Sequence, residues 1–100
     1  MDLLRLSFVE YIILKILTKK GVDAELYVYE IIKLSDGLVK RDTAYVTLGR
    51  MEKKGYVFSR KEDRQPGIKG QPRRFYRIRP SSIIHIEKLE AALLEFWGKL

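Results

Sequence analysis

The sequence predicts an α+β fold, mainly α, with three helices, a two-stranded hairpin and a final helix in one domain. A length of 100 residues suits one domain. Apolar residues form 46% and charged residues 33% of the chain, which is enough for one core and too apolar for a disordered tail. The apolar residues recur at helical spacing before Gly55 and at strand spacing after it, and this change predicts the order of the elements.

The first two helices are expected in the first third of the chain. Ser7 and Glu10 have the spacing of a capping box, so a helix should start there and end near Lys20. Apolar residues cover more than half of its circumference, which is typical of a central core helix. Asp23 is the expected N-cap of a second helix that runs through Leu34.

The third helix is expected from Asp42 to Lys54. Asp42 is its expected cap, and Gly55 follows its last residue. Tyr45, Leu48 and Met51 recur at intervals of three and are expected on the core side, so the rest of the helix should face outward.

A basic hairpin and a last helix are expected after the third helix. The runs 56–60 and 74–79 are aromatic and β-branched, which favours strands, and the segment 61–72 between them is rich in Gly and Pro. Ser81 and Ser82 are expected to cap a helix that runs to the C-terminus. Three helices and a basic hairpin are typical of a winged helix-turn-helix, whose third helix enters a major groove of DNA.

The positive charge of the chain is local. The chain has 20 Lys and Arg against 13 Asp and Glu, a net charge of +7. Residues 41–79 hold twelve basic and four acidic side chains, whereas the other 61 residues have a net charge of −1. Such a local excess is typical of a surface that contacts the phosphate backbone of nucleic acid.

The outward face of the third helix and the hairpin hold the candidate DNA contacts. Arg50 can contact guanine with two hydrogen bonds, Thr43 and Thr47 can bond base edges, and Val46 can pack on a thymine methyl group. Gly49 predicts a close approach of DNA or of another backbone. The alternatives are a solvated helix face and a merely solubilising hairpin tip. The residues expected to contact DNA are Thr43, Val46, Thr47, Arg50, Lys53, Lys54, Lys61, Arg64, Lys69, Arg73, Arg74 and Arg77.

The last helix predicts a dimer interface. Its apolar residues recur at spacings of three and four, the seam of a coiled coil. The helix can pair with its own copy, pair with the partner's first helix, or pack on its own domain. Phe96 and Trp97 can line a site for a small aromatic effector or serve as core anchors. The interface candidates are Ile86, Leu89, Leu93, Phe96, Trp97 and Leu100.

No catalytic or metal site and no cofactor are expected. The chain has no cysteine and one histidine, His85, which is expected to be solvated or to cap the last helix. Carboxylates such as Glu87 lack a partnered nucleophile. The apolar stretch from Phe8 to Leu17 contains two charged residues and is too short to span a bilayer, so a cytoplasmic protein is expected.

Four short motifs carry a family resemblance. They are FVEYIILKIL at 8–17, YEIIK at 29–33, TAYVTLGRMEKKGYV at 43–57 and GQPRRFYRI at 70–78. Together they resemble the PadR family of winged-helix transcriptional regulators, in its small type with a single C-terminal helix. The resemblance implies a dimeric repressor that binds operator DNA and that a small aromatic compound sometimes releases. It also adds Tyr45 to the residues expected to contact DNA.

The sequence as a whole predicts a homodimeric transcriptional repressor that binds double-stranded DNA at a pseudo-palindromic operator. Residues 1–80 are expected to form the DNA-binding domain and residues 81–100 the dimerisation helix. The alternative is a winged helix that binds an acidic protein partner within a larger assembly. An enzyme is disfavoured because no catalytic constellation is present.

Overall fold

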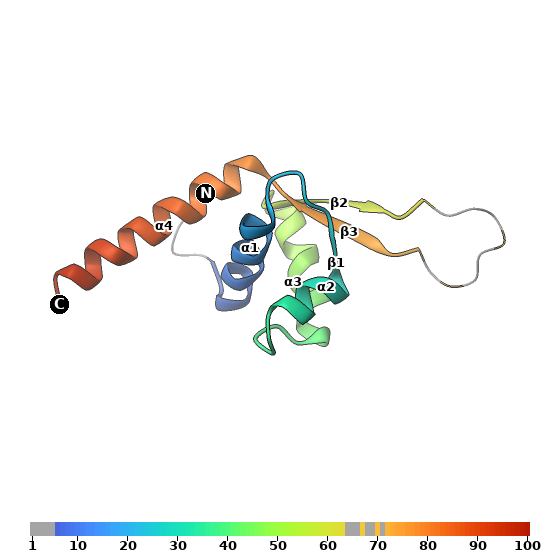
Figure 1. Ribbon diagram of the computed structural model, residues 1–100, viewed down its shortest axis with the longest axis horizontal. Helices are drawn as coiled ribbons and strands as arrows, with labels where there is room; N and C mark the ends of the chain where they lie inside the picture. The colour runs from blue at the N-terminus through green and yellow to red at the C-terminus, as the bar shows by residue number, and fades with distance from the viewer. Residues whose placement is uncertain (1–5, 64–66, 68–69, 71) are drawn as a thin grey trace.

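The computed structural model describes residues 6–63, 67, 70 and 72–100. Helices α1 to α3 form the centre of the molecule, strands β2 and β3 extend from it to one side, and helix α4 extends to the other (Figure 1). This is the mainly helical winged-helix fold that the sequence predicts. The elements are α1 (Phe8–Lys20), β1 (Leu26–Tyr27), α2 (Val28–Leu34), α3 (Arg41–Lys53), β2 (Val57–Lys61), β3 (Arg74–Ile78) and α4 (Pro80–Gly98).

Helix α1 begins with the predicted capping box. The Glu10 N–H donates to Ser7 Oγ at 3.1 Å, and the Ser7 N–H donates to Glu10 Oε1 at 2.9 Å. Two of the free N–H groups of the helix start are thereby satisfied. Ile13, Leu14 and Leu17 are fully buried, which confirms α1 as a central core helix.

The prediction of the second helix is wrong for the residues before Val28. Leu26 and Tyr27 form strand β1, and α2 begins only at Val28. Leu26 pairs with Tyr76 of β3. The backbone N–H and C=O groups of this stretch therefore find their hydrogen-bond partners in the sheet rather than in a helix. The expected cap Asp23 therefore lies before β1, and Tyr27 precedes α2, with its N–H donating to Glu30 Oε1 at 3.0 Å.

The three strands form one antiparallel sheet in the order β1-β3-β2. Its inner face packs on the helices through buried side chains such as Val57, Tyr76 and Ile78. Because side chains alternate along a strand, Phe58 and Phe75 lie on the outer face. The structure places β2 one residue later than predicted and ends β3 one residue earlier, within the usual uncertainty of element ends.

Helix α3 turns a different side to the core than the sequence predicts. Leu48 and Met51 are buried as expected, but Ala44 is the third core residue and Tyr45 is 55% exposed. The expected cap Asp42 lies in the first turn instead, because the helix already begins at Arg41. A Cβ at position 49 would meet no atom of the described residues outside its own helix backbone within 4 Å, so no other described segment approaches this glycine closely.

Helix α4 packs on the domain only through its first half. Ile86 is fully buried and Leu89 packs partly buried against the core, whereas every residue from 91 to 100 is exposed. At the end of the packed part, Glu90 accepts hydrogen bonds from Tyr11 Oη at 2.8 Å and Lys15 Nζ at 2.6 Å. These contacts fix the direction of α4 relative to α1.

The expected roles of polar residues at the start of α4 are wrong. Ser82 does not cap the helix, because its hydroxyl is buried and donates to the Tyr56 carbonyl at 2.9 Å. His85 is buried rather than solvated, and its ring lies 5.9 Å from the Tyr56 ring. Both side chains therefore join α4 to the start of β2. Among the described residues, no helix combines the length and hydropathy needed to cross a membrane.

Candidate nucleic-acid interface

The outward face of α3 presents most of its predicted contact residues. Thr43, Val46, Arg50 and Lys53 are exposed at spacings of three and four, so they form one stripe along the helix. Thr47 is the exception, because it is fully buried and no described residue forms a hydrogen bond with its Oγ1. A fully buried side chain cannot reach a base edge, so the prediction of a base contact for Thr47 is wrong.

A groove separates this helix from the root of the hairpin. Its volume is about 300 Å³, and its walls come from β1, the start of α2, the exposed side of α3 and the segment that leads into β3. Tyr29 and Tyr45 are 72% and 55% exposed, and their hydroxyl groups can donate to phosphate oxygens. The lining residues are Tyr27, Val28, Tyr29, Tyr45, Pro72, Arg73 and Arg74.

Sequence reasoning missed Tyr27 and Tyr29 as members of this site. The apolar neighbours of Tyr29 follow helical spacing, which favours a buried stripe that includes Tyr29. The start of α2 at Val28 instead turns Tyr29 toward solvent. The signal that could have found it is an aromatic residue in the first turn of the helix that precedes α3.

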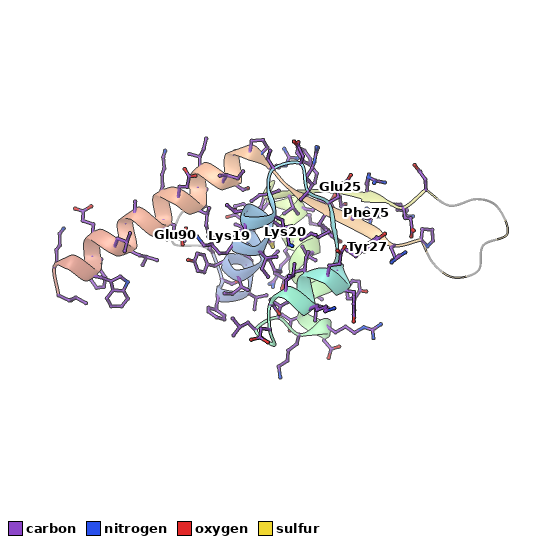
Figure 2. The ribbon with its side chains drawn as sticks, viewed as in Figure 1. Lys19, Lys20, Glu25, Tyr27, Phe75 and Glu90 are labelled. Carbon is purple, nitrogen blue, oxygen red and sulfur yellow. The ribbon has the colours of Figure 1, made fainter. Side chains whose placement is uncertain are left out.

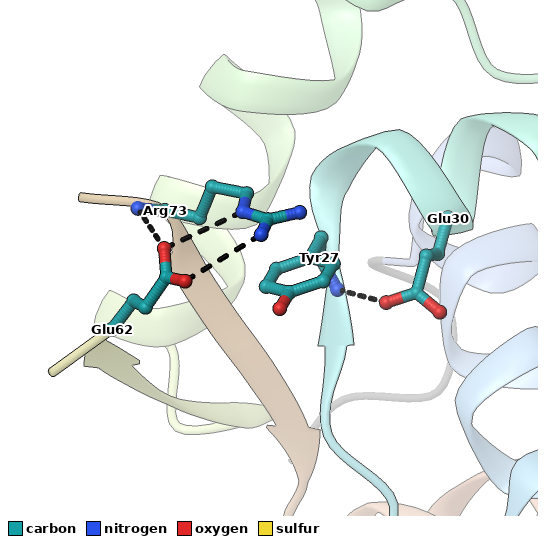
Figure 3. A network of polar contacts seen from close by, with 4 residues as sticks. All are labelled: Tyr27, Glu30, Glu62 and Arg73. Atoms are coloured by element: carbon teal, nitrogen blue, oxygen red, sulfur yellow. Dashed lines mark hydrogen bonds and ion pairs between the residues drawn. The ribbon is translucent and has the colours of Figure 1, made fainter. Parts of the chain in front are cut away.

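Arg73 is held in place at the edge of the groove (Figure 3). Its backbone N–H donates to Glu62 Oε2 at 3.1 Å, and its guanidinium lies 3.4 and 3.5 Å from the two Glu62 oxygens. The same guanidinium lies 4.1 Å from the centre of the Tyr27 ring. The side chain remains 56% exposed, so it can still meet a phosphate group from the solvent side.

The remaining predicted basic contacts lie in different parts of the structure. Lys61 is exposed on β2, and Arg74 is half-buried and donates to Ser59 Oγ at 2.9 Å. Lys54 donates to the buried carboxylate of Glu10 at 3.0 Å, so it joins α3 to α1. Arg77 lies on the outer face of the sheet, away from α3, and the structure does not bring it to the groove. The predicted contacts Arg64 and Lys69 lie outside the described residues.

The buried end of the Lys54 ion pair has a shifted pKa. Burial by itself raises the pKa of Glu10, but the hydrogen bonds from Ser7 and Lys54 outweigh it and lower the pKa below the ordinary value. Glu10 is therefore a structural anion near the C-terminal end of α3. No cluster of three or more potential metal ligands occurs in the part of the chain that the structure describes.

The predicted dimer residues divide between the core and the surface. Ile86 is fully buried within its own domain, so the prediction that it forms part of an interface between copies is wrong, and the half-buried Leu89 packs on the same core. Leu93, Phe96, Trp97 and Leu100 are exposed by 39%, 53%, 62% and 82%. Leu94, which the sequence pattern did not single out, is 73% exposed beside them.

Solved structures of transcription regulators share this fold. A PadR family transcription regulator from Clostridium difficile matches with a TM-score of 0.70 and 26% identity over 93% of each chain. A transcriptional regulator from Clostridium thermocellum matches with a TM-score of 0.65 and 30% identity over 92% of this chain and 84% of the other. Bacillus subtilis PadR, solved in complex with operator DNA, matches with a TM-score of 0.65 and 20% identity over 81% of this chain and 45% of the other. No protein-family model and no curated protein sequence matches the chain.

Proposed function

Because the chain belongs to the PadR family of winged-helix transcriptional regulators, we propose that it is a homodimeric repressor that binds double-stranded DNA in the cytoplasm. The observation that carries the proposal is the groove between α3 and the hairpin root, which tyrosine and arginine side chains line. The exposed stripe of α3 and the groove beside it supply the two kinds of contact that a specific DNA complex needs, to base edges and to phosphates.

The exposed stripe of α3 reads the bases. Arg50 is exposed and has no ion-pair partner among the described residues, so its guanidinium is available for the two acceptors of guanine. Thr43 can bond a base edge, and Val46, which is 63% exposed, can pack on a thymine methyl group. These three residues lie within two turns of one helix, so they contact neighbouring base pairs.

The hairpin and the start of α2 hold the phosphate backbone. Arg73 stands beside Tyr27, and Arg74 and Tyr29 line the same groove. Contacts from Arg and Tyr to phosphate fix the register of the protein on the duplex without reading its sequence. The family resemblance supports this role of the hairpin, because the hairpin motif GQPRRFYRI is the most specific part of the resemblance.

The exposed second half of α4 is the proposed dimer surface, and it covers Leu93 to Leu100. Two copies that pair through it would be related by two-fold symmetry, which places two recognition helices about 34 to 36 Å apart on successive major grooves. A pseudo-palindromic operator follows from this symmetry. Repression then results from occupation of the promoter and needs no chemical step.

An aromatic effector is part of the same proposal. The rings of Phe96 and Trp97 lie 5.5 Å apart on the exposed part of α4. In a dimer, a flat aromatic molecule could insert beside these rings and change the distance between the two recognition helices. Such a ligand would weaken operator binding without contact to DNA.

A selection of bound sequences from a random duplex pool tests the proposed function. We expect enrichment of two inverted half-sites, separated by about one turn of DNA. Enrichment of a single half-site would contradict the symmetric dimer. If no duplex is retained at physiological salt, the protein is not a DNA-binding repressor, and a protein-interaction role replaces the proposal.

A further inference from the structure

The outer face of the sheet carries aromatic rings that alternate with arginines. Phe58 lies opposite Arg77 in the register of β2 and β3, and Arg60 lies opposite Phe75. Tyr27 of β1 continues this row, with its ring 4.3 Å from the Phe75 ring. Figure 2 shows Tyr27 and Phe75 beside each other where β1 meets β3. This face lies on the opposite side of the sheet from α3.

Two of the three rings are covered by arginines whose charge is already balanced. Arg60 lies 4.5 Å from the centre of the Phe75 ring, and its Nε donates to Glu25 Oε2 at 2.6 Å. Arg73 lies over the Tyr27 ring and pairs with Glu62. Each of these units combines a ring, a cation and a carboxylate within the protein, so neither contains a guanidinium that lacks a protein partner.

The Phe58 ring differs because two arginines converge on it without a carboxylate. The guanidinium of Arg79 lies 4.2 Å from the ring centre and that of Arg77 lies 5.0 Å from it. Neither side chain donates a hydrogen bond to any described residue, and Arg79 Nε is buried without a partner among those residues. A guanidinium has five N–H donors, so the two groups together offer an unfilled site for an anion.

A hollow of about 360 Å³ lies beside this pair of arginines. Phe58 and Phe75 both line it, together with Glu25 and Arg77. Its volume falls within the range of sites that take small organic groups, about 300 to 1,000 Å³. A planar group that enters it can therefore contact aromatic rings while an attached anion reaches Arg77.

We propose that this outer face binds single-stranded nucleic acid. A phosphodiester group lies between Arg77 and Arg79, and an unpaired base lies in the hollow against the Phe58 ring. Arginines that follow a backbone and aromatic side chains that stack on bases are the combination by which open sheet faces hold single strands. A carboxylate peptide would satisfy the arginines but leave the rings unused, and a duplex keeps its bases stacked inside.

The inference goes beyond the proposed function and does not rest on it. Operator binding uses Arg50 on α3 and the groove beside that helix, whereas the proposed site uses Phe58, Arg77 and Arg79, none of which lines that groove. The two activities therefore respond to different substitutions. Arg50→Ala should weaken operator binding and leave the binding of single strands unchanged.

Fluorescence anisotropy with a labelled 12-nucleotide oligothymidylate tests the anion site. Each phosphate of a single strand that the protein neutralises adds about 0.7 to the slope of log K against log salt concentration, so Arg77→Gln/Arg79→Gln, which loses the one phosphodiester between the two arginines, should reduce the magnitude of that slope by about 0.7. The matched control Lys20→Gln/Lys88→Gln removes two exposed charges elsewhere and should reduce it by less than half as much. Equal slopes for the two double variants would overturn the proposal, as would wild-type protein that fails to bind the oligonucleotide at 150 mM salt.

A second variant tests the stacking of a base. Phe58→Leu keeps an apolar side chain but removes the ring, so it should weaken oligothymidylate binding about fivefold or more. It should not change the binding of an abasic oligomer of the same length. An equal loss with both oligomers would overturn the base assignment. Competition by poly-glutamate at the same concentration of negative charge should be at least tenfold weaker than by unlabelled oligonucleotide, and equal competition would show an acidic protein partner instead.

Discussion

Lys54 at the C-terminal end of α3 donates a hydrogen bond of 3.0 Å to Glu10, a buried carboxylate in the first turn of α1. Glu10 also closes the capping box with Ser7. One carboxylate thus fixes the start of the core helix α1 and the position of α3 relative to it. The lysine that sequence analysis assigned to DNA has a structural partner.

Lys54→Gln is expected to destabilise the fold because it leaves the Glu10 carboxylate buried without its cation. A buried charged group that loses its partner costs about 1 to 3 kcal/mol. The change should appear as a lower urea midpoint, measured by circular dichroism at a fixed protein concentration. Lys53→Gln removes an equivalent charge from an exposed neighbour and should shift the midpoint little. Equal shifts for the two variants would contradict the structural role of Lys54.

The same carboxylate predicts a dependence of stability on pH. The pKa of Glu10 is lower in the folded protein than its ordinary value of about 4.5, so below that pH the unfolded chain binds more protons than the folded one. Its contribution to stability is therefore present above about pH 4.5 and is lost as the pH falls through the folded pKa. Urea unfolding from pH 6 to pH 3 should show a steeper loss for the wild type than for Glu10→Gln, and parallel curves would refute the assignment.

Arg50→Ala is expected to weaken specific DNA binding by about 1 to 3 kcal/mol and to leave nonspecific binding almost unchanged. The reason is that a guanidinium with two hydrogen bonds to guanine reads one base pair. The measurement compares the Kd of the selected operator with that of a random duplex at one salt concentration. Unchanged discrimination between the two duplexes would remove Arg50 from the base-reading face.

Arg73→Ala is expected to weaken binding to operator and random duplex alike. A lost phosphate contact reduces the salt slope by about 0.9 and carries no sequence information. Titrations at several salt concentrations measure both effects. Lys88→Ala, which removes an exposed charge from α4, is the control and should leave the slope unchanged. A loss confined to the operator would show that the hairpin reads bases.

Thr47→Val is expected to preserve DNA binding and to maintain or raise stability by up to about 1 kcal/mol. Valine has nearly the shape of threonine, and Thr47 Oγ1 is a buried polar atom without a hydrogen bond to any described residue. Operator affinity and the urea midpoint check the two parts of this expectation. A large loss of operator affinity in a stably folded variant would return Thr47 to the DNA interface.

Local signals predicted the elements whose contacts are local. The capping box of Ser7 and Glu10 located the start of α1, and the change of period at Gly55 located the hairpin. Strand β1 was missed because Leu26 pairs with Tyr76, fifty residues away, and nothing within the segment 23–34 records that pairing. Alternation along residues 74–79 predicts that Arg77 and Arg79 share one face, and both guanidinium groups do lie over the Phe58 ring, but only the register of the sheet shows that this face is the outer one.

The side of α3 that faces the core shows a second limit of prediction from helical spacing. Residues 44, 48 and 51 and residues 45, 48 and 51 both fit one helix stripe, and the prediction used the second set because its members recur at intervals of three. The structure selects Ala44, a small residue that allows close packing of α3 on the helices around it. Tyr45 then faces the groove. Helical spacing thus limited the choice to neighbouring positions, and tertiary packing decided between them.

Leu93→Glu and Ile86→Glu should separate the dimer surface from the core. Leu93 is 39% exposed on the part of α4 that leaves the domain, whereas Ile86 is fully buried within it. A charge at position 93 should therefore produce a folded monomer. The charged side chain is solvated in the monomer, whereas in the dimer it would lie against an apolar surface of the partner. A charge at position 86 should unfold the protein. Sedimentation velocity gives the mass, and circular dichroism reports folding. If Leu93→Glu sediments as a folded dimer, the surface from Leu93 to Leu100 is not the interface, and the symmetric spacing of the recognition helices must arise elsewhere.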